Sequence, residues 1–466
     1  MAAIDSQEDN MRKTSTAAFL FGTLLLVPLL CLSCSKDKAN TKLQDDAPYA
    51  TVEQNATEPT GGKFSGLYIT VKTTFAGTDG NANNFQNCIK EWQHSTGCKI
   101  IDTSANSGEA FKARVIDDFD SGTEPDVLFF FTGADSNKFI SENKVVPIDE
   151  IRRSYSSYAA NMDATRVPKS LVDGKAYAIP VNGYWEALYY NAEILKQAGV
   201  AIPGPSYTMT QFKSDCAKIK DAGLVPIAAA LGDVPHYWWE FMIFNRGTVE
   251  SHDIIPKSAD DKEGSAWVNG LEDLKDLYEM GFFPEDTLTV SDAEIFTRFA
   301  TGKAAFLAQG SWKCNGIVRE AGGAEAAKKF GVAFFPGSKS RKATDIIGGI
   351  SMGYYITRKA WNNPKKRDAA VDFVSFMTND RNVSLFAEHS ITALRKTQEV
   401  DMNKLNPLQI KAVDFLKSVT SLTPAVQDIF QGECRKSTFE KMDDLVTGRT
   451  SIYSAVQEGF DKYYGN

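Results

Sequence analysis

The chain has 466 residues, of which 43% are hydrophobic and 24% charged. This balance is typical of a folded globular protein, and it excludes a chain that is largely disordered, collagen-like or coiled coil. Acidic residues outnumber Lys and Arg by 59 to 51, which gives a formal net charge of −8. Binding to nucleic acid along the whole chain requires a basic surface, so the charge argues against a nucleic-acid partner. At about 150 residues a domain, the length suggests about three domains.

The first segment of the chain has the pattern of a secretory signal. Two basic residues precede an apolar run over 17–33, which is the order of charge and hydrophobicity in a signal peptide. The run is shorter than the roughly 20 residues that a membrane-spanning helix needs. We therefore expect residues 1–33 to be a signal peptide, with an uncleaved membrane anchor as the alternative. Met1 and Met11 are both candidate starts.

A cysteine stands at the end of this apolar run. Ser33 directly precedes Cys34, and Cys31 occupies the position three before it. This order resembles the signal of bacterial lipoproteins, although Leu is the usual residue where Cys31 stands. The resemblance implies that the signal is cut before Cys34 and that a lipid on Cys34 holds the protein to a membrane. Residues 34–62 are polar, and we expect them to be a flexible tether.

Strand-like and helix-like segments alternate after the tether. In chain order, we expect a strand over 67–71, a helix around 85–92, a strand over 99–101, a helix over 111–119, strands over 125–131 and 331–336, and a helix that begins at Pro364. Strand–helix–strand units of this length indicate an α/β protein with a parallel sheet covered by helices on both faces.

The sequence offers little material for a metal site or a covalent mechanism. It contains four histidines and has no G-x-S-x-G elbow, P-loop or H-E-x-x-H motif. The cysteines of the body form no C-x-x-C pattern; they are Cys88, Cys98, Cys216, Cys314 and Cys434. We expect most of them to be small buried residues, and a Cys88–Cys98 disulfide stays open. No metal or cofactor is expected.

Aromatic residues gather in polar, loop-like settings. Tyr184 and Trp185 lie between Asn182 and Glu186, and two further groups occupy 236–240 and 309–312. A flat ring beside carboxyl and amide groups suits a sugar, because the ring covers the C–H face and the polar groups bind hydroxyls. For each ring, burial in the core is the open alternative.

The order of motifs along the body resembles the extracellular solute-binding proteins of ABC importers, the family of maltodextrin-binding protein. The most specific segment is Asp-Gly-Lys-Ala-Tyr-Ala-Ile-Pro over 173–180, followed by Tyr190-Asn191. A second segment, 299–306, leads to Gly-Ser-Trp over 310–312. The resemblance runs from about residue 67 to residue 464.

The resemblance implies a two-lobed periplasmic-binding-protein fold (type II), in which each lobe is a sheet flanked by helices. It divides the body into an N-lobe, 63–181 plus 336–391, and a C-lobe, 182–335 plus 392–466. The chain is expected to cross between the lobes three times, near 181–186, 335–336 and 391–392. Ligand would lie between the lobes and favour their closure.

The same resemblance implies a function in uptake. The protein would bind a sugar or oligosaccharide, deliver it to ABC transporter permease subunits, and act as a monomer in the periplasm or at the cell surface, without being an enzyme. A polyol or glycerol-phosphate ligand stays open, with Arg246 or Arg435 as the cation for phosphate. A lipid-anchored glycoside hydrolase also stays open, and would need two carboxyl groups about 5–9.5 Å apart.

The family's motifs also imply which residues contact the ligand. Trp312 matches the stacking Trp of the family, and Tyr184 matches a ligand-facing position on the first crossing strand. Asn182 and Glu186 share one strand face with Tyr184. The other expected ligand-binding residues are Asp135 in the loop after strand 125–131, Asp79 and Glu109 in similar loops, one of Trp238 and Trp239 as a second stacking ring, and Gly349.

Overall fold

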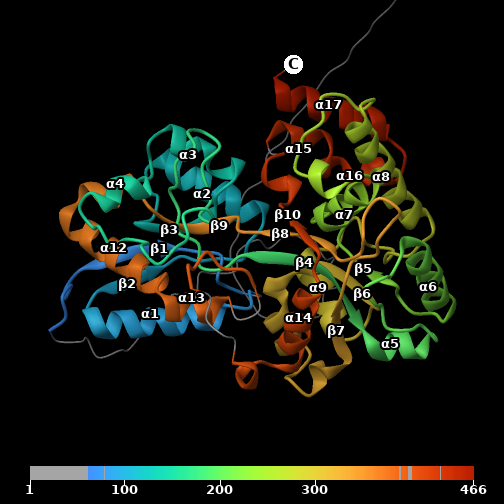
Figure 1. Cartoon of the computed structure of the whole chain (residues 1–466), viewed down its shortest axis with the longest axis horizontal. Helices are drawn as coiled ribbons and strands as arrows, with labels where there is room; N and C mark the ends of the chain where they lie inside the picture. The colour runs from blue at the N-terminus through green and yellow to red at the C-terminus, as the bar shows by residue number, and fades with distance from the viewer. Residues whose placement is uncertain (1–60, 78, 388–389, 397–400, 431, 466) are drawn as a thin grey trace, which may run out of the picture. The chain divides into compact units, whose positions relative to one another are not determined.

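The computed structural model describes residues 61–77, 79–387, 390–396, 401–430 and 432–465, which form two lobes that each contain a β-sheet (Figure 1). The expected signal peptide, Cys34 and nearly all of the expected tether lie outside the described residues. Among the residues that are described, none of the helices is both long enough and apolar enough to cross a bilayer.

The N-lobe holds a four-stranded sheet with the strand order β2–β1–β3–β9. β1 pairs in parallel with β2 and β3, whereas β9 runs antiparallel to β3. The strands are β1 (Tyr68–Lys72), β2 (Lys99–Asp102), β3 (Val127–Phe131) and β9 (Met352–Ile356). The helices are α1 (Ala82–Thr96), α2 (Glu109–Ser121), α3 (Asn137–Ser141), α4 (Ile148–Arg152), α11 (Arg358–Asn362), α12 (Pro364–Met377), α13 (Asp380–Phe386) and the 3-10 turn η1 (Ala134–Ser136).

Both faces of this sheet are covered, because β3 is apolar at every position. Val127 and Phe129 pack into the cluster that contains α1 and α12. Leu128 and Phe130 point to the opposite face, where α2 and α3 pack. Figure 1 shows these two pairs of helices on opposite sides of the sheet. The predicted buried strand and its flanking helices therefore agree with the structure.

The C-lobe holds a six-stranded sheet with the order β10–β8–β4–β6–β5, and β7 also pairs with β4. The strands are β4 (Tyr184–Asn191), β5 (Ile227–Ala228), β6 (Phe306–Gly310), β7 (Phe330–Ala333), β8 (Asp345–Gly349) and β10 (Ser421–Thr423). The helices are α5 (Ala192–Gln197), α6 (Met209–Asp221), α7 (His236–Arg246), α8 (Lys262–Glu279), α9 (Asp292–Ala300), α10 (Cys314–Glu320), α14 (Pro407–Lys417), α15 (Glu433–Ser437), α16 (Met442–Val446) and α17 (Ile452–Tyr464). The 3-10 turns are η2 (Val249–Ser251), η3 (Ser311–Lys313), η4 (Ala326–Lys329), η5 (Met402–Lys404), η6 (Val426–Asp428) and η7 (Phe439–Lys441).

The sheets are mixed: β1 pairs in parallel with β2 and β3, as the strand–helix–strand pattern predicted, but other pairs are antiparallel. β4 runs antiparallel to β6, β7 and β8, and β9 runs antiparallel to β3. β4 and β9 are the first strands after the chain has changed lobes. They therefore enter their sheets without the strand–helix–strand connection that makes neighbouring strands parallel.

The points at which the chain changes sheets differ in part from those expected. Ile179 bridges to Tyr354 in the first sheet and Tyr184 pairs with Gly349 in the second, so the first crossing lies between them, near the expected range. β8 belongs to the second sheet, so the second crossing follows Gly349 and is not near 335–336. The third comes after residue 395, later than 391–392, because the backbone N–H of Arg395 still donates to the carbonyl of Asn161 at 2.9 Å.

A buried arginine explains the misplaced second crossing. Arg341 is 2% exposed and donates to the carbonyls of Phe335 at 3.1 Å and Pro336 at 2.7 Å. These bonds hold the loop after β7 in the C-lobe, although Pro336 ends the apolar pattern of the strand. Residues 336–349 therefore stay with the second sheet.

The five cysteines of the body are buried free thiols in the structure. Burial raises the pKa of Cys88 to about 11 and that of Cys98 to about 12. Because Cys88 and Cys98 are both free thiols, the disulfide that the sequence left open is not formed in the structure.

Candidate functional site

Loops of the N-lobe contact the C-lobe along a line that we call the interlobe cleft. The backbone N–H of Gly80, in the loop after β1, donates to the carbonyl of Trp312 at 3.0 Å. The side chain of Asn315 donates to the carbonyl of Gly80 at 3.3 Å. At the start of α2, a carboxylate oxygen of Glu109 lies 3.2 Å from a guanidinium nitrogen of Arg435. These contacts join residues that are more than 200 positions apart in the sequence.

Three half-buried rings of the C-lobe lie together at this cleft, and we call them the aromatic wall: Tyr184, Tyr237 and Trp312. The ring centroid of Trp312 lies 6.2 Å from that of Tyr184 and 6.1 Å from that of Tyr237. β4, α7 and η3 each supply one of the rings. The hydroxyl of Tyr184 accepts the backbone N–H of Ala425 at 3.0 Å, which fixes that ring.

Buried carboxyl groups lie beside the aromatic wall. Glu186 is 1% exposed, and its Oε2 atom has no hydrogen-bond partner among the described residues. Burial, together with the charges of Glu240 and Asp428, raises the pKa of Glu186 well above its usual value. Glu240 accepts the backbone N–H groups of Val426 and Gln427, each at 3.0 Å. Burial and, next, the Glu240 charge raise the pKa of Asp428 to about 7.

Cationic groups near the cleft are held by carboxylates. The Nζ atom of Lys112 lies 2.9 Å from Asp135 and 3.5 Å from Glu109. Arg435, 5% exposed, pairs with the same Glu109. Burial lowers the pKa of His236 well below its usual value, and the charges of Arg435 and Lys112 lower it further, so His236 is neutral at pH 7.

Most of the residues predicted from the sequence meet at or beside the cleft. Trp312, Tyr184 and Glu186 belong to the C-lobe side of it, and Asp135 and Glu109 belong to the N-lobe side, in the ion pairs just described. Asp79 also lies along the cleft; its carboxylate accepts the backbone N–H of Asn81 at 2.7 Å, and burial raises its pKa to about 7. Asn182 is half-buried just before β4, and Gly349 pairs with Tyr184.

The expectation that Trp238 or Trp239 stacks on ligand is wrong, because both rings are buried in the C-lobe core. Trp238 is 2% exposed and Trp239 is 0% exposed. Trp238 contacts Phe283 edge-on at 5.7 Å, and Trp239 contacts Trp267 at 4.7 Å. At 3.6 residues per turn, positions 236, 237 and 240 of α7 share a face that 238 and 239 do not. The ring that reaches the aromatic wall is therefore Tyr237, which the sequence reasoning missed.

Other cleft residues were also missed or misjudged. Glu240 lies within the aromatic group noted in the sequence, and the helical phase of α7 could have identified it. Asp428 lies in the short turn η6, and no motif marks it. Of the two arginines considered for phosphate, Arg435 pairs across the cleft, whereas Arg246 forms a two-bond pair with Asp273 of α8, with both distances at 2.6 Å.

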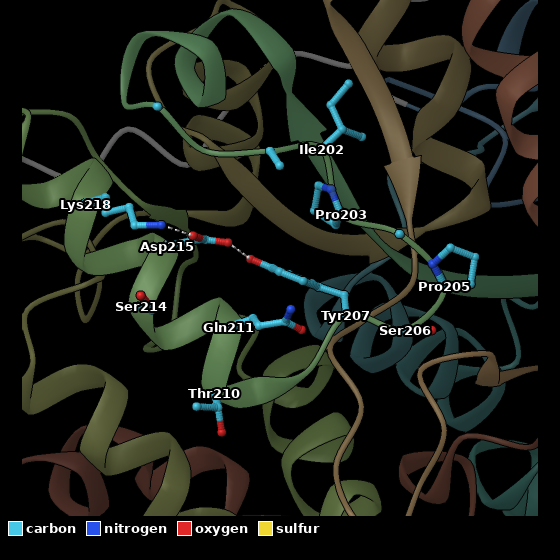
Figure 2. Close-up of a pocket in the computed structure, with 13 residues that line it drawn as sticks. Ile202, Pro203, Pro205, Ser206, Tyr207, Thr210, Gln211, Ser214, Asp215 and Lys218 are labelled. Atoms are coloured by element: carbon cyan, nitrogen blue, oxygen red, sulfur yellow. Dashed lines mark hydrogen bonds and ion pairs between the residues drawn. The ribbon is translucent and has the colours of Figure 1, made fainter.

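A separate groove of about 800 Å³ lies on the C-lobe (Figure 2). It is lined by residues between 199 and 218, none of which was predicted as a site residue. Tyr207 and Lys218 converge there on Asp215, and each donates to its carboxylate at 3.0 Å. Within the part of the chain that the structure describes, no group of three or more His, Cys, Asp or Glu residues is placed to hold a metal ion.

Residues 76–383 match the model of the family described as bacterial extracellular solute-binding protein, and the chain belongs to that family. Several solved structures share the fold at low sequence identity. A chitin oligosaccharide binding protein is 19% identical, with a TM-score of 0.73 over 86% of this chain and 98% of that one. The GacH receptor of Streptomyces glaucescens GLA.O is 20% identical, with a TM-score of 0.67 over 85% and 97% of the two chains.

Two further comparisons agree with this assignment. The binding protein RafE, solved with raffinose, is 15% identical, with a TM-score of 0.65 over 85% of this chain and 99% of that one. A curated protein of Brucella abortus (strain 2308), whose name is "Putative binding protein", is 24% identical over 207 residues, which is 42% of this chain. The matched segment spans 46% of that relative's length.

Proposed function

We propose that this protein is the solute-binding component of an ABC importer and that it binds a sugar or oligosaccharide in the interlobe cleft. The observation that carries the proposal is the aromatic wall, in which Tyr184, Tyr237 and Trp312 lie beside buried carboxyl groups at a cleft with residues from both lobes. Such rings suit the C–H face of a sugar, and the carboxyl groups suit its hydroxyls. The solved structures with this fold include proteins named for oligosaccharide binding.

In this proposal, binding is coupled to closure of the lobes. Trp312 covers the sugar from the C-lobe, while Asp135 and Asp79 reach it from the N-lobe. A ligand that contacts both sides does so only when the lobes are closed, and it therefore shifts the population toward the closed state. The closed surface is what the permease subunits would recognise. No covalent step is needed, so the protein would not be an enzyme.

The proposed location follows from the sequence of the first 62 residues. A lipid on Cys34 would anchor the protein to a bacterial membrane, and the tether would keep the folded body, a monomer, at the membrane surface in the periplasm or outside the cell. A glycerol-phosphate ligand is less well supported than a sugar, because Arg435 already pairs with Glu109.

A thermal-shift screen of the purified protein over mono- and oligosaccharides tests the proposal. A ligand at one hundred times its Kd should stabilise the protein by about 2.7 kcal/mol. Trp312→Ala should weaken binding of the best ligand by about 2 kcal/mol or more, whereas Trp312→Phe, which keeps a ring, should retain part of the affinity. An unchanged shift in Trp312→Ala would remove Trp312 from the site. Release of shortened sugars on incubation would favour a glycoside hydrolase instead.

A further inference from the structure

Glu186 is a buried carboxyl group with an unused acceptor that faces the proposed ligand site. It is 1% exposed, and its Oε2 atom has no hydrogen-bond partner among the described residues. Glu186 and Tyr184 are two positions apart on β4, so both side chains lie on the same face of the strand. Buried polar atoms in folded proteins nearly always have a partner, so an orphaned carboxylate oxygen beside an aromatic wall indicates a ligand that donates to it.

The carboxyl groups nearest to Glu186 differ in how they are satisfied. Glu240 is fully buried but accepts two backbone N–H groups, and the Nε2 atom of His252 lies 3.4 Å from it. Glu240 therefore contributes negative charge to the site and has its own donors. Asp428 contributes a second charge, and both charges act on Glu186.

The cations near the cleft form ion pairs with Asp135, Glu109 and Asp292. Lys112 is shared between Asp135 and Glu109, and Arg435 pairs with Glu109 as well. Lys313, the residue after Trp312 in the sequence, pairs with Asp292 at 3.3 Å. The charges that act on Glu186 are those of Glu240 and Asp428. Glu186 acts in turn on the rings of Tyr184 and Tyr237, and Asp292 acts on Tyr237 as well. Lys112, Asp135 and Arg435 act on Asp428. Both of the charges that act on Glu186 are therefore negative, and these surroundings favour a positively charged partner.

The three rings suit the same kind of ligand. The electron-rich faces of Trp and Tyr attract a cation that lies within about 6 Å of the ring centre. An ammonium group also has three donors, one of which can bind an unpartnered carboxylate oxygen. A neutral hydroxyl can supply the hydrogen bond, but it has no positive charge to offset those of Glu240 and Asp428 or to be attracted to the ring faces as a cation is.

We propose that the saccharide bound in this cleft carries a free, protonated amino group. This group donates a hydrogen bond to the Glu186 carboxylate and lies against the rings of the aromatic wall. The proposal rests on the proposed function and narrows it to amino sugars. Since the ammonium charge favours ionised carboxyl groups, its arrival lowers the pKa values of Glu186 and Asp428. Both values are raised in the absence of ligand, so binding of an amino sugar at pH 7 releases protons.

Isothermal titration with matched sugars tests the proposal. The probes are glucosamine, N-acetylglucosamine and glucose, and the β-1,4-linked tetramers of glucosamine and of N-acetylglucosamine. The amino form should bind at least about tenfold more tightly than its N-acetylated partner, as expected for a buried charge pair. Titration in two buffers of different ionisation enthalpy should show proton release for the amino form only.

Two variants separate the charge of Glu186 from its shape. Glu186→Gln keeps the size of the side chain but removes the charge, so it should weaken binding of the amino form by much more than binding of the neutral form and abolish the preference for the amino form. Glu124→Gln is the matched control, because Glu124 is also a buried glutamate with an unpartnered Oε2 atom but lies before β3, outside the cleft. It should change neither affinity.

Three results would overturn the proposal. One is equal or tighter binding of the N-acetylated or neutral sugars, another is an equal loss of both forms in Glu186→Gln, and the third is binding of neutral sugars with none of the amino forms. If no saccharide of any kind binds, the proposed function itself fails, which is a different result.

Discussion

Gly133 lies where the backbones of the two lobes come into close contact. It follows β3 in the N-lobe, and its φ of −82° is outside the left-handed region that favours glycine. A Cβ atom at this position would lie 2.4 Å from the carbonyl oxygen of Asp428 in the C-lobe, whereas ordinary contact begins at 3.4 Å. Gly133→Ala therefore requires the two backbones to separate by about 1 Å at this point. Each lobe should still fold.

We expect Gly133→Ala to weaken binding of the best saccharide by at least about tenfold, or about 1.4 kcal/mol, because the closed state becomes less favourable. Isothermal titration measures the affinity, and small-angle X-ray scattering measures the decrease in radius of gyration when ligand is added. Gly204→Ala is the control, since a Cβ atom at Gly204 has no neighbour within 4 Å and its φ is not left-handed. Wild-type affinity together with wild-type compaction in Gly133→Ala would refute the reasoning.

Two further predictions concern pH and the α7 helix. The carboxyl pKa values of Asp79 and Asp428 are both raised to about 7, so the folded protein binds more protons than the unfolded chain between the ordinary value of 3.8 and about 7. The stabilisation that protonation of these two carboxyl groups gives to the folded protein is complete below pH 3.8 and is lost as the pH rises through about 7. Calorimetry of the ligand-free protein should therefore show a lower Tm at about pH 8 than at about pH 5, and a smaller difference in Asp428→Asn; an unaltered pH profile in that variant would contradict the assignment. On α7, Trp238→Ala should lower the free energy of unfolding by about 3–5 kcal/mol, whereas Tyr237→Ala should mainly weaken saccharide binding. Urea denaturation and titration together separate these effects, and a large loss of stability in Tyr237→Ala would place its ring in the core.

Local patterns in the sequence predicted much of the fold. Phe85, Ile89 and Trp92 recur at helical spacing and all lie on the buried face of α1, which ends at Gly97 with a φ of 72°. Asn363 caps α12 by accepting the backbone N–H of Lys366, as the Asn-Pro sequence predicted. These helices are determined by side-chain spacing and capping between residues that are close in the sequence, so they can be predicted from one sequence.

The features that the sequence did not predict depend on tertiary contacts. The second crossing follows β8 because buried Arg341 holds the preceding loop, an interaction that no local pattern shows. In α7, the position at which the helix begins decides whether Tyr237 or the following tryptophans face the cleft. Asp428 reaches the cleft from a short turn near the end of the chain, and only the fold brings it beside Glu186.

The central claim, that the interlobe cleft binds a saccharide without altering it, is tested most directly by titrating the purified protein with saccharides and recovering the ligand afterwards. We expect one saccharide to bind for each protein chain, to be recovered chemically unchanged, and to lose most of its affinity in Trp312→Ala. Absence of binding across the saccharide panel, or recovery of cleaved sugar, would contradict the account.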